Sequence, residues 1–355
     1  MREEIELPDR EIRLGLFLSG QHPPEASAAA AVREHLEQVE LARSLGFSSV
    51  WAGQHFLSAP FQMFQSVLLL ARMAAAAEGL TVGTAIVLLT LLNPVEVAEN
   101  AATLSAIANG NFVLGVGLGY RAVENAAFGV AQMTVRERAE LFEQKLDVVR
   151  RLLSGETVSA ASHGFSIAEA KLALVPDRRP PIWIAANSDS AVRRAARLGD
   201  AWFVNPHTRL EELERQMGLY KDVRRQCGLP PPATAPVLKE VCVGDTDEAA
   251  LEVARPHLKK KYEAYVDWGQ SDVLPRTDTL RREFAELTAG GRFVIGSPET
   301  CVEILADHVE RLGADHFVCR LQWPGMPQRD VLRSMRLLAR EVLPALRTRT
   351  RASSR

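Results

Sequence analysis

Short apolar runs alternate with longer stretches of helical periodicity along most of the 355 residues of the chain. Each apolar run is typical of a β-strand, and the stretches between them repeat hydrophobic residues at the spacing of an amphipathic helix. The predicted strands cover residues 11–19, 47–56, 80–89, 112–116, 201–206, 237–243 and 316–323, and residues 180–190 are predicted as a strand that runs into the start of a helix. Strands and helices in this order predict an α/β protein, a single (β/α)8 TIM barrel with insertions.

A doubly wound α/β sheet is the alternative architecture, but its phosphate-binding glycine pattern is missing. The first predicted strand is followed by SGQHPP, which is not G-x-G-x-x-G. The run from Gly115 to Gly119 spaces its glycines as G-x-G-x-G, without a suitably placed acidic residue downstream. The sequence therefore argues against a dinucleotide-binding fold.

The chain length is compatible with either two domains or one barrel. No linker rich in Pro, Gly or Ser interrupts the alternation, so we expect one domain over residues 1–355. Within it we expect a hairpin-like insertion at 157–176, a helical insertion or lid at 247–291 and a disordered basic tail at 347–355.

Two of the predicted helices begin with capping signals. Asn93 precedes Pro94 and Glu96, so it can cap a helix whose first turn holds the proline, and Glu96 can complete a capping box. Thr134 lies three residues before Glu137, which is the spacing of a capping box.

Composition excludes several classes of protein. The 42 Lys and Arg residues against 44 Asp and Glu residues give a formal net charge of −2, so a nucleic-acid partner is not expected. The 47% of hydrophobic residues argues against disorder. The four cysteines form no C-x-x-C pair and the histidines show no metal spacing, so no metal site is expected. Neither a signal peptide nor a membrane span is evident, which predicts a cytoplasmic protein.

A parallel barrel places its active site at the C-terminal ends of its strands. Gln54 and His55 end the second predicted strand, and Trp323 and Met326 lie at the end of the last one. Gln54, Trp323 and Met326 are candidates for a substrate pocket, and His55 is the candidate catalytic residue. A histidine at a strand end is commonly structural, and catalysis by His55 is the competing interpretation.

The sequence Asn187-Ser188-Asp189-Ser190 lies between a predicted strand and a predicted helix. A helix N-terminus offers free N–H groups and a partial positive charge, so this loop can bind a phosphate. Ser188 can also serve only as the helix cap, and the two roles are compatible.

Together, several segments resemble the bacterial luciferase-like family of flavin-dependent oxidoreductases. The resemblance extends from the second strand to the last helix, so it covers nearly the whole chain. It is carried by SVWAGQHF, VGTAIVLLTLLNPVEVAENAATL, NGNFVLGVGLGY, PIWIAANSDSAVRRAARLGDAW and LQWPGMPQRDVLRSMRLLAREVLPAL. The family resemblance implies a TIM barrel that binds reduced FMN or the deazaflavin F420.

The same resemblance implies roles for single residues. The loop 187–190 looks like the site of the flavin phosphate. Thr84, Ala85 and Ile86 match the strand end that lies against the flavin ring, where the family often has a non-prolyl cis peptide. Tyr120 matches a residue near the cofactor.

The luciferases carry two histidines after a glutamate, where this chain has Gly53-Gln54-His55. Gln54 thus replaces the first histidine, and His55 remains as a candidate acid, base or hydrogen-bond donor. The implied activity is a monooxygenase in which O2 adds to C4a of reduced FMN and the peroxide oxidises a small organic substrate. A separate flavin reductase would supply the FMN, and family members usually form homodimers.

Two other functions stay open at this point. One is hydride transfer by an F420-dependent oxidoreductase, although the run TAIVLLTLLNPVE looks more like the FMN members. The other is a flavin-binding protein without catalysis, which the loss of a histidine at Gln54 would explain.

Overall fold

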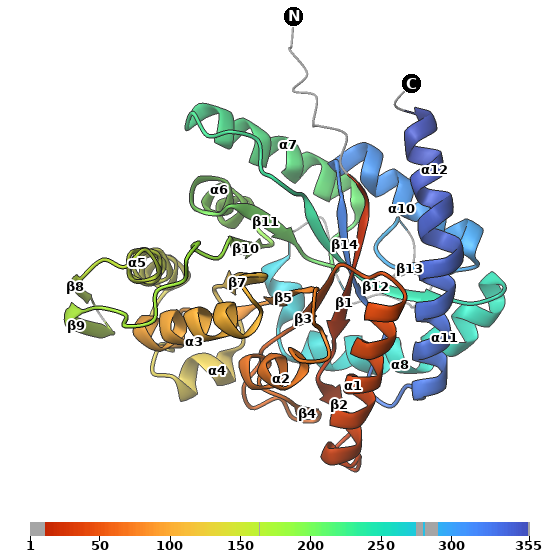
Figure 1. Cartoon of the computed structure of the whole chain (residues 1–355), viewed down its shortest axis with the longest axis horizontal. Helices are drawn as coiled ribbons and strands as arrows, with labels where there is room; N and C mark the ends of the chain where they lie inside the picture. The colour runs from red at the N-terminus through yellow and green to blue at the C-terminus, as the bar shows by residue number, and fades with distance from the viewer. Residues whose placement is uncertain (1–10, 163, 275–279, 281–289, 354–355) are drawn as a thin grey trace, which may run out of the picture.

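The computed structural model describes residues 11–162, 164–274, 280 and 290–353. Its parallel strands form a closed barrel, because β7 pairs with β10 as well as with β5 (Figure 1). The barrel strands are β1 (Arg13–Leu18), β3 (Ser49–Ala52), β5 (Thr81–Thr84), β7 (Phe112–Gly117), β10 (Ile182–Ala186), β11 (Ala201–Val204), β12 (Pro236–Val243) and β14 (His316–Arg320). The predicted TIM barrel is confirmed.

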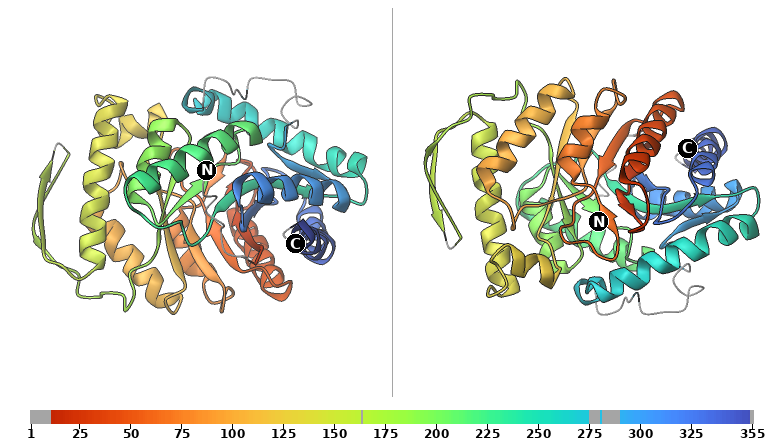
Figure 2. Two further views of the ribbon diagram at one scale, coloured as in Figure 1. Left: turned by 90° about the horizontal axis from the view of Figure 1, so that it is seen from above. Right: turned by 90° about the horizontal axis from the view of Figure 1, so that it is seen from below.

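Helices follow the strands in the chain and surround the barrel (Figures 1 and 2). Helix α5, for example, buries Phe142, Leu146 and Val149, an apolar stripe at helical spacing. The helices are α1 (Ala28–Ser44), α2 (Ser66–Met73), α3 (Pro94–Ile107), α4 (Ala122–Ala127), α5 (Val135–Leu153), α6 (Asp189–Leu198), α7 (Leu210–Gln226), α8 (Asp247–Asp267), the 3-10 helix η1 (Gln270–Val273), α10 (Pro298–Leu312), α11 (Gln328–Leu337), the π-helix η2 (Leu338–Val342) and α12 (Leu343–Ser353).

The predicted helix starts agree with the structure. Asn93 caps α3 by accepting a hydrogen bond from the backbone N of Val95 at 2.9 Å. The capping box at α5 is present, with Thr134 and Glu137 each bonding the backbone of the other. At α3 it is the asparagine side chain, rather than a reciprocal pair with Glu96, that forms the cap.

The single strand expected over 80–89 is divided into β5 and the short β6 (Val87–Leu88). Between Gly83 and Val87 the chain advances one residue more than β7 does between Val113 and Val116, so the ladder contains a bulge. The Oγ1 of Thr84 causes this break, because it bonds both the backbone N and the O of Gly115 at 2.8 Å. The expected non-prolyl cis peptide joins Ala85 to Ile86.

Five further short strands lie outside the barrel or extend it. Strands β2 (Gln21–His22) and β4 (Gln62–Met63) form a small antiparallel pair, and β13 (Val294–Gly296) adds to β12. The hairpin β8 (Val158–Ser162) and β9 (Phe165–Ala170) lies beyond α5 at the edge of the molecule (Figure 2).

The tail expected to be disordered from residue 347 is instead the end of α12, which continues to Ser353. Arg347 explains the order, because its guanidinium donates to the backbone O of Ile12 at 2.7 Å and pairs with Glu11 at 2.9 Å. In the predicted insertion at 247–291, the structure describes α8 and η1, while residues 275–279 and 281–289 lie outside the described part.

A cluster of aromatic side chains fills the inside of the barrel. The rings of Trp51 and Trp183 stack with centroids 4.7 Å apart, and Phe203 lies 5.4 Å from Trp51. Gly83 leaves the room for this stack, since a Cβ there would lie 2.2 Å from the Trp51 ring. Phe17 belongs to the same cluster and also lines the pocket described below.

Candidate active site

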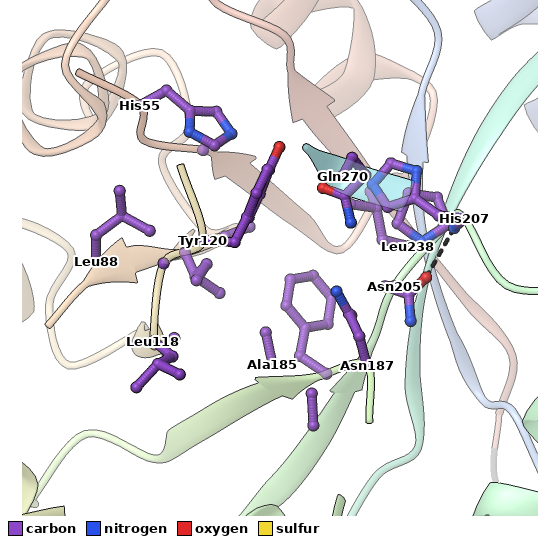
Figure 3. Close-up of a pocket in the computed structure, with 18 of the residues that line it drawn as sticks. His55, Leu88, Leu118, Tyr120, Ala185, Asn187, Asn205, His207, Leu238 and Gln270 are labelled. Carbon is purple, nitrogen blue, oxygen red and sulfur yellow. Dashed lines mark hydrogen bonds between the residues drawn. The ribbon is translucent and has the colours of Figure 1, made fainter. Parts of the chain in front are cut away.

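A pocket of about 380 Å³ opens at the C-terminal ends of the barrel strands. Figure 3 shows His55 and Tyr120 on one side of it, Asn205 and His207 on the other, and Ala185 between them. Its apolar walls are formed by Phe17, Ala85, Ile86, Leu88, Leu118, Ala185, Phe203 and Leu238.

The structure brings together most of the residues that the sequence nominated. Those that line the pocket are Gln54, His55, Ala85, Ile86, Tyr120, Asn187 and Ser188. The nominated residues that do not line it are Thr84, Asp189, Ser190, Trp323 and Met326. The side chain of Thr84 is instead fully buried between β5 and β7.

Trp323 and Met326 correct the sequence-based prediction, because both side chains are buried in the protein interior. An indole N–H needs a partner when it is buried, and that of Trp323 donates to Oε2 of Glu240 at 2.6 Å. Met326 packs within the main hydrophobic core. The last strand therefore reaches the pocket through another residue, Arg320.

The loop at the start of α6 presents only its first two residues to the pocket. Asp189 turns away and pairs with Arg215 at 2.5 Å, and the hydrogen bond from Arg215 lowers the pKa of this carboxyl. The hydroxyls of Ser188 and Ser190 lie 3.1 Å apart. Ser188 also caps α6, so Asn187 and Ser188 are the residues placed to meet a ligand.

His55 is held in place by a buried carboxylate. Its Nδ1 lies 3.0 Å from Oε1 of Glu124, which is fully buried and also accepts from the backbone N of Phe56 at 2.8 Å. Arg121 lies 3.5 Å from the same oxygen. With Nδ1 engaged in this way, the other ring nitrogen of His55 is left for a ligand.

Several polar atoms around the pocket are buried without a hydrogen-bond partner among the residues that the structure describes. They are Oγ of Ser19, the hydroxyl of Tyr120, Nδ2 of Asn205, Nε2 of Gln270 and Nε of Arg320. All of them can donate. A buried donor without a partner costs about 1–3 kcal/mol, so this set indicates a ligand that carries several acceptor atoms.

Tyr120 keeps its proton in this setting. Burial raises the pKa of its phenol well above the ordinary value, and the neighbouring Tyr265 and Glu124 raise it further. The neutral phenol is a hydrogen-bond donor at any physiological pH.

Three buried charges form one group in the wall made by β12, β14 and α8. Oε1 of Glu240 accepts from Nζ of Lys261 and, at 3.0 Å, from Nη1 of Arg320. Burial opposes the charge on Glu240, but the two cations outweigh it and lower the pKa to about 2. Burial and the charge of Arg320 lower the pKa of Lys261 to about 7.

The end of α8 and the residues after it cover one side of the pocket. The indole of Trp268 donates to the backbone O of Ala59 at 3.0 Å and packs 5.5 Å from the ring of His55. The guanidinium of Arg121 lies 4.0 Å from the centre of the indole, a cation–π contact. Tyr265 stacks on Trp268 with ring centroids 5.2 Å apart. That this segment opens and closes as a lid stays a prediction.

Sequence reasoning missed the charged residues that organise the site. Glu124 lies in α4, whereas its partner His55 follows β3, so no local spacing in the sequence indicated their contact. Arg320 is the one Lys, Arg, Asp or Glu residue in the predicted strand HFVCRLQW, and such a lone charge in a strand indicates a buried partner. The partners, Glu240 and Lys261, lie too far away in sequence to be inferred.

The described residues were also searched for a metal-binding group and for a membrane-spanning helix. They contain no group of three or more His, Cys, Asp or Glu side chains placed to hold a metal ion. None of their helices is both long enough and apolar enough to span a bilayer.

Comparison with known proteins agrees with the fold and identifies the family. Residues 12–316 match the family model of the luciferase-like monooxygenases. The solved structure of monooxygenase RslO1 from Streptomyces bottropensis is 22% identical, with a TM-score of 0.83, and the match covers 94% of this chain and 99% of that one.

Two further similarities involve different cofactors. The oxygenating component of 3,6-diketocamphane monooxygenase from Pseudomonas putida, solved with FMN, is 18% identical with a TM-score of 0.75, covering 94% and 98% of the two chains. An F420-dependent glucose-6-phosphate dehydrogenase from Beutenbergia cavernae is 27% identical, covering 91% and 96%. The barrel, its pocket and the match over most of the chain lead to one conclusion: the chain belongs to the luciferase-like monooxygenase family.

Proposed function

We propose that this enzyme is a monooxygenase that uses O2 and reduced FMN, delivered by a separate flavin reductase, to oxidise a small organic substrate. The observation that carries the proposal is the apolar pocket, the slot for the ring, bordered by buried donors that have no partner among the described residues. An isoalloxazine is flat and apolar and has acceptor atoms along one edge, so it matches such a slot.

The slot depends on small residues where the ring would lie. A Cβ added to Gly117 would lie 2.0 Å from Cδ1 of Ile86 and 3.7 Å from Cβ of Ala185. A larger residue would therefore fill the space between these walls. Asn187 and Ser188, with the N-terminus of α6, are placed to hold the phosphate.

Bound reduced FMN supplies the electrons with which O2 is activated. The chain's own residues would then bind the substrate, exclude water and move protons. Apolar walls around Ile86 and Leu88 keep water from the reaction. The free nitrogen of His55 can hold or transfer a proton, with Glu124 fixing its orientation, while Tyr120 donates a hydrogen bond.

The relatives support a flavin and leave F420 as the second candidate. A structural neighbour was solved with FMN, whereas a sequence relative is named as F420-dependent. The test is to titrate the purified protein anaerobically with reduced FMN and, separately, with F420. Binding of FMN with no binding of F420 is expected, and the reverse result would contradict the FMN proposal.

Ala185→Phe is expected to abolish flavin binding, because the phenyl ring would occupy the slot beside Ile86. We expect the dissociation constant for FMN to rise at least 100-fold, a loss of about 3 kcal/mol. Ala168→Phe, on the exposed face of β9, is the matched control and should bind FMN as the wild type does. Unchanged FMN binding in Ala185→Phe would place the cofactor elsewhere.

Glu124→Gln is expected to slow product formation about 10- to 100-fold, as the loss of an orienting partner commonly does. The amide can still accept from Phe56, so the fold should survive, but it no longer carries the charge that orients His55. The rate of product formation should be measured as a function of pH. A changed pH profile would separate this role of Glu124 from a purely structural one. An unaltered rate and profile would show that Glu124 does not act through His55.

A further inference from the structure

The wall made by β12, β14 and α8 holds two buried cations against one buried carboxylate. Glu240 and Lys261 are fully buried, and the side chain of Arg320 is 8% exposed. Burial opposes the charge of Arg320, but Glu240 and the tyrosines beside it outweigh that effect and raise its pKa. Arg320 therefore stays charged, and the group carries excess positive charge whenever Lys261 is protonated.

The described groups that surround these charges do not supply the missing negative charge. Burial, together with Lys261, lowers the pKa of His207 well below its usual value, so this ring is neutral. Burial raises the pKa values of Tyr262 and Tyr265, so both phenols are neutral as well. Asp272 also lines the pocket, but it is exposed to solvent. The pocket thus presents a buried cation that an anion can reach.

The guanidinium of Arg320 has one edge engaged and one edge with a free donor. Its Nη1 donates to Glu240 at 3.0 Å, whereas its Nε is buried without a partner in the described part of the chain. Its central carbon lies over the ring of Phe17, 4.1 Å from the ring centre, which is a cation–π contact. The Tyr265 phenol is a further hydrogen-bond partner of this guanidinium, so Nε is the donor left for a ligand, and it can form a charge-assisted hydrogen bond to a carboxylate oxygen.

Polar groups next to this edge suit an oxygen ligand. Ser19 comes directly after β1 and lines the same pocket as Phe17, and its buried hydroxyl has no partner among the described residues. Gln21 and Tyr265 are bonded to each other at 3.2 Å and line the same pocket.

We propose that the substrate is an organic anion whose carboxylate pairs with the Nε edge of Arg320. This inference rests on the proposed function, because it names the class of molecule that the oxygenase would accept beside the flavin. It is carried by the excess buried charge and by the buried Nε of Arg320, which has no partner among the described residues.

The test uses benzoate and its neutral analogue benzamide as probes, with binding measured by calorimetry on the full chain with and without FMN. Wild-type protein should bind benzoate at least tenfold more tightly than benzamide, the effect of one charge-assisted pair. Arg320→Met should bind the two probes equally. This variant leaves Glu240 paired with Lys261 and Trp323, so it should fold.

Two further variants separate the pairing from a general loss of charge. Arg320→Lys keeps the charge without the Nε donor and should show an intermediate preference for benzoate. Arg224→Met removes an equally buried guanidinium that bonds backbone oxygens of Ala196, Gly199 and Pro230 outside the pocket, and it should keep the full preference.

Equal binding of benzoate and benzamide by the wild type would overturn the proposal. A preference that persists in Arg320→Met, with a tenfold loss of FMN affinity in that variant, would also overturn it and would assign Arg320 to the cofactor. If neither FMN nor F420 binds but the preference for benzoate still depends on Arg320, the anion site stands and the proposed monooxygenase function fails.

Discussion

The Gly115→Ala variant is expected to lose at least about 3 kcal/mol of folding stability, at the upper end of the cost of overpacking a core. An added Cβ would lie 1.9 Å from the backbone O of Thr84 and 3.0 Å from its carbonyl carbon. Those atoms are backbone and cannot rotate away, so β5 and β7 must separate. The bulge that carries Ala85 and Ile86 into the pocket would shift as well.

Unfolding in urea, followed by circular dichroism, measures this loss, and FMN binding measures the effect on the pocket. Gly218→Ala is the matched control, because a Cβ at this exposed position in α7 meets nothing within 4 Å. That control should be more stable by about 0.5–1 kcal/mol, since alanine is the better helix former. A Gly115→Ala protein that unfolds at the wild-type urea concentration would refute the steric argument.

The Glu240→Gln variant is expected to lose about 3–5 kcal/mol, because it leaves two buried cations without a carboxylate. Lys261 and Arg320 both bond to Oε1 of Glu240, and an amide oxygen cannot neutralise either. Glu143→Gln is the control: its carboxylate is one-third exposed and pairs with Arg194, so the loss there should stay within about 1 kcal/mol.

The cost of Glu240→Gln should depend on pH in a defined direction. The pKa of Lys261 is lowered to about 7 in the native protein, chiefly by burial, and the loss of its carboxylate would lower it further. Below pH 7 the wild-type protein holds the protonated Lys261 against Glu240, whereas the variant must bury an unpaired ammonium or release the proton. The difference in unfolding free energy should therefore be larger at pH 6 than at pH 8. A difference in unfolding free energy that does not change with pH would mean that Glu240 does not affect the pKa of Lys261.

Local signals in the sequence predicted the architecture well. The alternation of apolar runs with helical periods and the caps at Asn93 and Thr134 depend on neighbours within a few residues, and the structure confirms the barrel they indicate. The break between β5 and β6 could not be predicted in this way. It depends on Thr84 bonding to Gly115, 31 residues further along the chain.

The site was predictable where a strand end alone decides what faces the pocket, as at His55 and Asn187. It was not predictable where a distant partner decides it. Trp323 was expected at the pocket, but its indole is buried in the interior, where it donates a hydrogen bond to Glu240, 83 residues earlier in the chain. Arg320 reaches the pocket for a related reason, because the same carboxylate holds one edge of its guanidinium.

The stacked pair of Trp51 and Trp183 gives the protein an internal optical reporter. These rings lie inside the barrel in one cluster with Phe17 and Phe203, which also line the pocket. Tryptophan emits at wavelengths that flavins absorb, so energy transfer to a bound isoalloxazine would quench the emission of this pair. Occupancy of the pocket can therefore be followed in solution without attaching a dye.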